Sequence, residues 1–109
     1  MEDCIFCKIV SGDMKSQIVD ADDSVIVIKD IHPQAPVHYL IIPKKHVRDL
    51  SDLDDPVVAA DILLMANKLA NQLPGDRACK LISNNGRDAG QSVFHFHMHF
   101  LSGKKMDAF

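Results

Sequence analysis

Hydrophobic residues alternate with histidines over residues 94–100, which read Phe-His-Phe-His-Met-His-Phe. Successive side chains of a β-strand point to opposite faces, so a period of two predicts a half-buried strand. The face directed to the core would carry the apolar members, Phe94, Phe96, Met98 and Phe100. The other face would carry three imidazoles, those of His95, His97 and His99.

Short apolar runs between turn residues predict four more strands, at residues 18–19, 25–28, 37–42 and 78–83. The first two runs flank a polar turn, as in a β-hairpin. The third run ends at Pro43, and its alternation predicts two different faces. One face would carry Val37, Tyr39 and Ile41, and the other His38, Leu40 and Ile42.

One long helix is predicted from Pro56 to Leu73. Asp55 suits the N-cap, Pro56 suits the first position, and Pro74 follows the end. Its apolar residues recur every three or four positions, at Val58, Ile62, Met65, Leu69 and Leu73. The apolar segment 3–10 is interpreted as a short helix or a turn. Strands with short connections around one long helix indicate an α+β domain on a mainly antiparallel sheet.

Composition excludes several classes of protein. With 109 residues, 47% hydrophobic and 25% charged, the chain suits one globular domain. No apolar run is long enough to span a membrane. The net charge of −3 and the lack of a basic stripe argue against a nucleic-acid polymer as partner. The N-terminus lacks the features of a signal peptide, so a cytoplasmic protein is expected.

Three histidines on one strand face admit three interpretations: a metal site, a polar surface without function, or a catalytic face. One strand rarely supplies a closed metal site alone. A glycine-bearing turn, Gly90-Gln91-Ser92-Val93, precedes the strand, and its N–H groups and the Ser92 hydroxyl can bind an anion. An imidazole nucleophile beside such a turn is what phosphoryl transfer requires, so these flanking residues favour the catalytic interpretation.

Residues 95–100 have the form His-φ-His-φ-His-φ, in which φ is hydrophobic. Three other segments accompany them in order, namely 30–38 (DIHPQAPVH), 42–46 (IPKKH) and 84–93, with its Gly-Gln-Ser-Val turn. In these features the chain resembles the histidine-triad (HIT) superfamily and, within it, the Hint-like nucleotide-binding branch. The resemblance implies a single HIT domain over residues 1–109. Its fold would be a five-stranded, mainly antiparallel sheet with one long helix and a short N-terminal helix.

The resemblance also implies roles for the residues around the phosphate. His97, the middle histidine, would attack the α-phosphorus of a nucleotide, while the backbone carbonyl of His95 holds its other nitrogen. His99 would contact the phosphate, and His38 would support the pocket. The turn residues that would hold phosphate or leaving-group atoms are Gly90, Gln91, Ser92 and Val93.

The same resemblance implies that a purine nucleoside binds beside these histidines. Asp30 would accept hydrogen bonds from the ribose, Asn84 would contact ribose or phosphate, and Ile28 and Ile31 would enclose the base. The implied reaction is hydrolysis of a nucleoside 5′-phosphoramidate, or a related nucleotidyl conjugate, to a nucleoside monophosphate through a nucleotidyl-histidine intermediate. It requires no cofactor. The implied assembly is a homodimer in which two sheets meet.

Two other functions compete with this one. The first is a nucleotide-binding regulatory or adaptor protein whose hydrolysis is incidental. The second is a dinucleoside polyphosphate hydrolase, which shares the histidine triad. The Gly-Gln-Ser-Val turn before the triad argues against the second. Assaying an adenosine phosphoramidate with the His97→Ala variant separates an enzyme from an adaptor.

The motif Cys4-x-x-Cys7 has three interpretations of its own: chance, a redox pair, or half of a zinc site. No thioredoxin-like setting surrounds it, and spacing alone does not supply two further ligands. The resemblance supplies them, because relatives with this motif hold structural zinc through the histidine after Pro-Lys-Lys and the first triad histidine. The set here would be Cys4, Cys7, His46 and His95. Cys79 is expected to be a small core residue.

Overall fold

The computed structural model describes residues 3–107. The expected lack of a signal peptide rests partly on Met1 and Glu2, which lie outside the described residues. The helices are α1 (Ile5–Ser11) and α2 (Pro56–Asn71), with two short 3-10 helices at Leu50–Asp52 and Arg87–Ala89. The strands are β1 (Ile18–Ala21), β2 (Val25–Lys29), β3 (Val37–Pro43), β4 (Lys80–Ile82) and β5 (Met98–Ser102). They form one antiparallel sheet in the order β1-β2-β3-β5-β4. The predicted α+β fold is confirmed.

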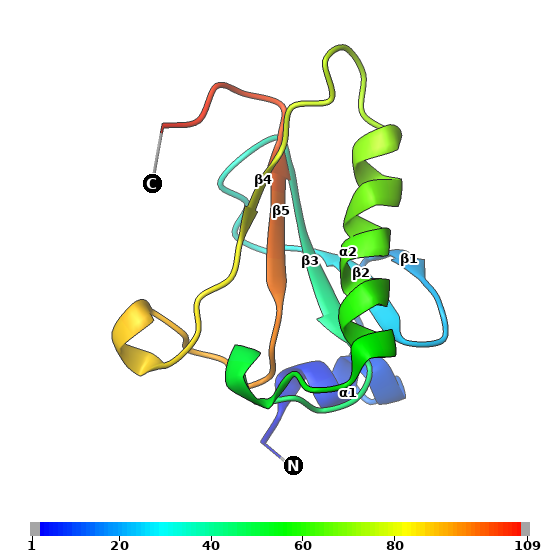
Figure 1. Cartoon of the computed structure of the whole chain (residues 1–109), viewed down its shortest axis with the longest axis vertical. Helices are drawn as coiled ribbons and strands as arrows, with labels where there is room; N and C mark the ends of the chain where they lie inside the picture. The colour runs from blue at the N-terminus through cyan, green and yellow to red at the C-terminus, as the bar shows by residue number, and fades with distance from the viewer. Residues whose placement is uncertain (1–2, 108–109) are drawn as a thin grey trace.

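One face of this sheet is covered by α2 (Figure 1). Alternate residues of the strands point to it, as the period of two predicts. The buried cluster between sheet and helix comprises Val25, Val27, Ile41, Val47, Val58, Ile62, Met65, Ala66, Leu69, Phe96 and Phe100. Val37, Tyr39 and Met98 pack at its margin. The predicted helix stripe and strand parity therefore describe this core correctly.

The opposite face carries a second, smaller cluster under α1, made of Phe6, Ile9, Ile26, Ile28, Leu40 and Ile42. The segment 3–10, interpreted as a helix or a turn, is a helix here. The Cys4 sulfur accepts a hydrogen bond from the Cys7 amide at its start, and Gly12, at φ 88°, ends it. Because α1 lies at the end of the sheet where β5 begins, it borders the histidine segment (Figure 1).

Helix α2 begins at Pro56, as expected, with the Asp55 carboxylate accepting from the amides of Val57 (3.0 Å) and Val58 (3.3 Å). It ends at Asn71, before the predicted Leu73. The next two amides bond three residues back, which tightens the last turn before Pro74. Leu73 still packs against the core.

The strand predicted over 94–100 is wrong at both ends. β5 starts at Met98 and continues to Ser102, because its partners β3 and β4 face only those residues. Before Met98 the chain bends, and the amide of Phe96 donates to the carbonyl of Val47 (2.6 Å). Phe94 is 38% exposed and does not anchor the core. β4 is likewise shorter than predicted, and Cys79, expected in the core, is exposed.

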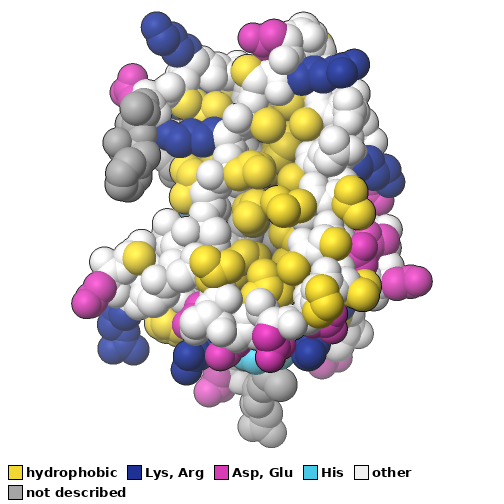
Figure 2. Space-filling model, in the orientation of Figure 1, with side chains coloured by type: hydrophobic (Ala, Val, Ile, Leu, Met, Phe, Trp, Pro, Cys, Tyr) yellow, Lys and Arg dark blue, Asp and Glu magenta, His cyan; other side chains and the backbone are white. Residues whose placement is uncertain are grey.

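Hydrophobic side chains gather on the surface between α2 and the β4 edge of the sheet (Figure 2). The large apolar residues exposed on these two elements are Val57, Leu63, Leu64 and Leu81. No helix within residues 3–107 combines the length and apolar character that crossing a membrane requires.

Candidate active site

His97 is fixed in one tautomer by its neighbour in sequence. Its Nδ1 lies 2.8 Å from the carbonyl oxygen of His95, and a carbonyl only accepts, so Nδ1 carries the proton. The lone pair of His97 is therefore on Nε2. Burial lowers the pKa of His97 from its usual value near 6.5, against the opposing effect of that hydrogen bond. The ring is thus neutral at pH 7, the form in which an imidazole can act as a nucleophile.

His99 is oriented by a hydrogen-bond chain from another strand. The backbone N–H of Gln34 donates to Nδ1 of His38 (3.0 Å), which places the proton of the neutral His38 ring on Nε2. His38 Nε2 lies 2.8 Å from His99 Nδ1 and donates to it. The proton of His99 then sits on Nε2, where it can be donated to a ligand. Burial also lowers the pKa of His99.

Asp30 lies beside this histidine pair at the end of β2. Its Oδ2 atom is 3.4 Å from His38 Nε2 and 3.9 Å from His99 Nδ1. Its Oδ1 atom accepts from the amide of His32 (2.8 Å), which closes a tight turn after β2. The His32 amide fixes the orientation of the carboxylate, and Oδ2 presents an acceptor next to the histidines.

All ten residues predicted to bind substrate line one cavity of about 520 Å³. They are Ile28, Asp30, Ile31, Asn84, Gly90, Gln91, Ser92, Val93, His97 and His99. The cavity has an apolar end under α1 and a polar end at the histidines, as a nucleotide requires. Ile31 is 83% exposed, so it forms an outer rim of the cavity. The individual roles given to these residues stay predictions.

Within the turn, Gln91 has a structural position. Its Oε1 accepts from the amide of Gly86 (2.8 Å), and its Nε2 donates to the carbonyls of Arg48 (2.8 Å) and Val93 (3.1 Å). These hydrogen bonds of its buried side-chain amide stabilise the loop. Gln91 is almost fully buried and lines the cavity only with its small exposed part. Ser92 is exposed beside it and has its hydroxyl available to a ligand.

The sequence did not indicate that α1 would close the cavity. Ile5, Phe6 and Ile9 line its apolar end, together with Met14 from the connection to β1. The ring centroid of Phe6 lies 5.0 Å from that of His97 in an edge-on arrangement. The spacing of the three α1 residues marks one helical face, but which surface that face covers depends on the packing.

His95 belongs to a different group from the other two triad histidines. It is fully buried, and its Nε2 lies 2.7 Å from the carbonyl of Pro43, so Nε2 carries the proton and Nδ1 is free to accept. Nδ1 is 3.2 Å from the Cys4 sulfur and 3.5 Å from the Cys7 sulfur. The three imidazoles therefore do not share one exposed strand face, because the chain bends before Met98.

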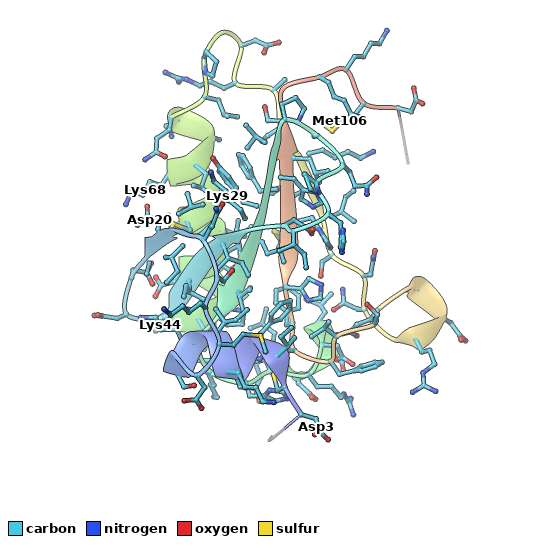
Figure 3. All side chains as sticks on the ribbon, turned by 180° about the vertical axis from the view of Figure 1, so that it is seen from behind. Asp3, Asp20, Lys29, Lys44, Lys68 and Met106 are labelled. Atoms are coloured by element: carbon cyan, nitrogen blue, oxygen red, sulfur yellow. The ribbon has the colours of Figure 1, made fainter. Side chains whose placement is uncertain are left out.

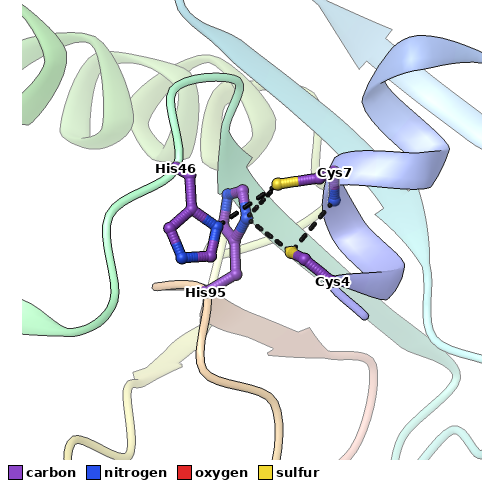
Figure 4. A group of neighbouring side chains, drawn as sticks. All are labelled: Cys4, Cys7, His46 and His95. Atoms are coloured by element: carbon purple, nitrogen blue, oxygen red, sulfur yellow. Dashed lines mark hydrogen bonds between the residues drawn. The ribbon is translucent and has the colours of Figure 1, made fainter. Parts of the chain in front are cut away.

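Cys4, Cys7, His46 and His95 converge at the start of α1 (Figure 4). One ligand atom from each lies within 4.8 Å of all the others, and His46 Nδ1 is 3.2 Å from the Cys7 sulfur. Two thiols and two imidazoles in this arrangement suit tetrahedral zinc. Burial and a hydrogen bond with Cys4 raise the pKa of Cys7 to about 11, so its thiolate is disfavoured without a cation.

Comparison with known proteins agrees with this architecture. A model of the HIT domain family matches residues 11–106. An uncharacterized HIT-like protein of Synechocystis sp. is 42% identical over 105 residues, which is 94% of this chain and 92% of the relative. A HIT family hydrolase from Clostridium thermocellum has a TM-score of 0.92 at 43% identity, covering 100% of this chain and 97% of that one.

A third solved structure is also similar to this chain. A zinc-bound histidine triad family protein from Mycobacterium smegmatis is similar in structure, with a TM-score of 0.85 at 33% identity. The alignment covers 97% of this chain and 78% of that protein. The family model covers most of the chain, and the relatives are 33–43% identical over nearly its whole length. The chain belongs to the HIT domain family.

Proposed function

We propose that this protein hydrolyses nucleoside 5′-phosphoramidates, or related nucleotidyl conjugates, to a nucleoside monophosphate. The observation that carries the proposal is the tautomer of His97, whose Nδ1 bonds the His95 carbonyl and leaves Nε2 free inside the cavity. A similar structure is named a HIT family hydrolase, which supports hydrolysis in general.

A purine nucleotide fits the gradient of polarity along the cavity. The base would pack among Ile28, Phe6 and Ile9 at the apolar end. The ribose hydroxyls would donate to Asp30, and the α-phosphate would lie at the histidines. There the N–H of His99 and the hydroxyl of Ser92 would donate to its oxygens.

Two displacements at phosphorus complete the proposed reaction. In the first, His97 Nε2 forms a bond to the α-phosphorus while the P–N bond to the leaving amine breaks. The amine nitrogen gains a proton from solvent, while the N–H of His99 remains a donor to the phosphate oxygens. In the second, water bonds to phosphorus and the P–Nε2 bond breaks. The nucleoside monophosphate leaves, one proton from water is released to solvent, and His97 returns to its neutral form with the proton on Nδ1.

The hydrogen bond between His97 and His95 favours both steps. Because Nδ1 keeps its proton throughout, the modified imidazole of the intermediate is cationic. A cationic imidazole is a good leaving group, and the His95 carbonyl stabilises its charge. The nucleophile is therefore activated by its tautomer and needs no bound metal at the phosphate.

Zinc is proposed at Cys4, Cys7, His46 and His95. The donor set suits this metal, and the free Nδ1 of His95 already faces both sulfurs. A similar protein is described as zinc-bound. Bound there, zinc would supply structural support by joining α1 to the loop after β3 and to the segment before β5.

A homodimer is the assembly that we propose. β4 is one of the two edge strands of the sheet, and an unpaired edge favours pairing with a second copy. Leu64 is 62% exposed and Leu81 is 41% exposed, in the apolar surface of Figure 2. Sedimentation should give a dimer for the wild type and a monomer for Leu64→Glu/Leu81→Glu. The control Ile18→Glu changes a comparably exposed apolar residue (58%) on β1, at the opposite edge of the sheet.

Incubation with an adenosine 5′-phosphoramidate tests the enzymatic proposal. Wild-type protein should release adenosine monophosphate, and His97→Ala should lower kcat/KM by several orders of magnitude. Thermal unfolding of the variant checks that it still folds. Tight nucleotide binding without turnover would instead favour the adaptor function, and equal turnover by both proteins would exclude His97 as the nucleophile.

A further inference from the structure

Cys4 and Cys7 form a pair of thiols that the proposed hydrolysis does not use. Both are free and half-buried at the start of α1, and their sulfur atoms lie within 4.8 Å of each other (Figure 4). Residues three apart at the start of a helix have Cα atoms about 5 Å apart, which lies inside the range of roughly 4.4–6.8 Å found for disulfides. Rotation of the two side chains can therefore join the sulfurs.

A surface cavity of about 390 Å³ opens on Cys4. His46, Ser92 and Phe94 contribute to its lining, and Cys7 does not. A cavity of this size holds several water molecules, and hydrogen peroxide is little larger than water. A small oxidant in solution therefore has a path to the Cys4 sulfur and meets it before that of Cys7.

The two sulfurs face imidazoles in the reduced protein. The Cys4 sulfur lies 3.2 Å from Nδ1 of His95, and the Cys7 sulfur lies 3.2 Å from Nδ1 of His46. Turning the sulfurs toward each other moves both of them away from these nitrogens. A disulfide also contains no thiolate, the form of sulfur that binds metal. The oxidised group would keep only two imidazoles as ligands, which is too few for structural zinc.

Helix α1 connects this cysteine pair to the nucleotide cavity. Its residues Ile5, Phe6 and Ile9 line the apolar end of that cavity, and the ring of Phe6 lies 5.0 Å from that of His97. A helix of seven residues depends on tertiary contacts for its position. Without the sulfur contacts, the apolar contacts of Phe6 and Ile9 would have to hold it alone. The base end of the cavity would then be less well ordered.

We propose that Cys4 and Cys7 are a redox modification site, which hydroperoxides convert to a disulfide with release of the zinc and weaker binding of nucleotide. The inference goes beyond the proposed function, and only its nucleotide readout rests on that function. Zinc binding and the redox interpretation of Cys-x-x-Cys then describe the reduced and the oxidised state of one motif.

Two nucleophilic steps complete the oxidation. In the first, the Cys4 sulfur attacks the O–O bond of hydrogen peroxide, which gives a sulfenic acid and one water. In the second, the Cys7 sulfur attacks the sulfenic sulfur, so the S–S bond forms, the S–O bond breaks and a second water leaves. The two sulfurs lose two electrons and the peroxide gains them. Protons from the thiols, or from solvent where the sulfurs are thiolates, complete the two waters.

Alkylation after mild oxidation tests the modification site. The protein as purified is treated with hydrogen peroxide, denatured, alkylated with iodoacetamide and mapped by mass spectrometry. We expect Cys4 and Cys7 to lose two hydrogens together, to escape alkylation, and to become reactive again after dithiothreitol. Cys79 is the internal control, because it is an exposed thiol outside this group. It should react later, since the sulfur ligands of zinc are deprotonated and the thiolate is the form that attacks peroxide.

A variant and two further measurements follow the consequences. Cys7→Ser lacks the second sulfur, so its Cys4 should stop at the sulfenic acid, which dimedone traps. In the wild type, a chromogenic zinc chelator should register one zinc released for each disulfide formed. Calorimetry should show that adenosine monophosphate binds about tenfold more weakly after oxidation, because the loosened α1 must be ordered again on binding. Dithiothreitol with added zinc should restore the affinity.

Four results would overturn the proposal. They are oxidation of Cys79 before the pair, oxidation of Cys4 to a sulfinic acid without a disulfide, a disulfide formed without zinc release, and an unchanged affinity for adenosine monophosphate. Reduced protein that does not bind adenosine monophosphate would instead overturn the nucleotide site of the proposed function. The disulfide and zinc measurements would still decide the modification site in that case.

Discussion

The ring of His97 and the carbonyl of His95 form a 2.8 Å hydrogen bond across two positions of the chain. His95 thereby contributes through its backbone to the candidate nucleophile and through its side chain to the Cys4 and Cys7 group. One residue links the two sites. The support of α1 and the position of the nucleophile are consequently coupled through His95.

Removing the two sulfur ligands should remove the proposed zinc. We predict that Cys4→Ser/Cys7→Ser contains no stoichiometric zinc and unfolds about 10 °C lower or more, because metal bound only by the folded state stabilises it. Metal analysis and thermal unfolding measure these effects. Cys79→Ser is the matched control, since Cys79 is exposed and outside the group. Wild-type protein purified without chelator and free of zinc would contradict the site.

In the proposed reaction His38 would act on the substrate through His99, as a positioning residue. We predict that His38→Ala lowers kcat/KM about tenfold to a hundredfold, because the proton of His99 is no longer held on Nε2. His38→Gln keeps a side-chain N–H donor and should recover part of the loss. A merely structural role would lower the thermal midpoint of both variants equally without this difference in rate.

Apolar runs, their periodicity and the turn and capping residues predicted most of the fold. The alternation in β3 and β5 assigned Ile41, Phe96 and Phe100 to the α2 side correctly, because side-chain direction is a local property of a strand. Strand ends were less predictable. Phe94 continues the alternation but lacks a partner strand, and pairing depends on distant residues.

In the candidate site, too, residues within sequence motifs were predictable, and residues brought in by tertiary packing were not. Motif residues such as Asp30, Ser92 and His97 were named from the sequence, and the structure places them around one cavity. The apolar end supplied by α1 was missed, because its docking depends on tertiary contacts.

Gly103 is required where the chain leaves β5. Its φ is +99°, and a Cβ at this position would lie 2.9 Å from Pro36 Cβ. Gly75 also has positive φ (+66°), but no described atom lies within 4 Å of a Cβ built there. Both alanine variants carry the backbone strain, and only Gly103→Ala adds a clash. Denaturant unfolding should show Gly103→Ala about 2 kcal/mol less stable than Gly75→Ala, and equal stabilities would contradict the close approach.

Lys68 of α2 pairs with Asp20 of β1 at 2.7 Å, and Figure 3 shows the two side by side. The hydrogen bond from Lys68, with one from the Ala21 amide, lowers the pKa of Asp20 from its usual 3.8. A lowered pKa stabilises the fold above the usual value, and this stabilisation is lost as the pH falls through the lowered one. Because Lys68 is 56% exposed, the contribution is below about 1 kcal/mol.

The Asp20→Asn variant tests this pair. It should be slightly less stable than the wild type at pH 7, and the difference should vanish in acid below the lowered pKa of Asp20. Asp23→Asn, which removes an exposed carboxylate from the same turn region, is the control and should change stability little at either pH. A difference that grows on acidification would contradict the assigned sign.

In the proposed reaction His97 forms a covalent bond to the nucleotide. The direct measurement is to mix the protein with excess adenosine phosphoramidate, quench it within the first turnover under alkaline denaturing conditions, and record its intact mass. We predict a gain of one adenylyl group, mapped to His97 by peptide sequencing and absent from His97→Ala. Turnover with the adduct on His95 or His99, or turnover that His97→Ala retains, would contradict the account.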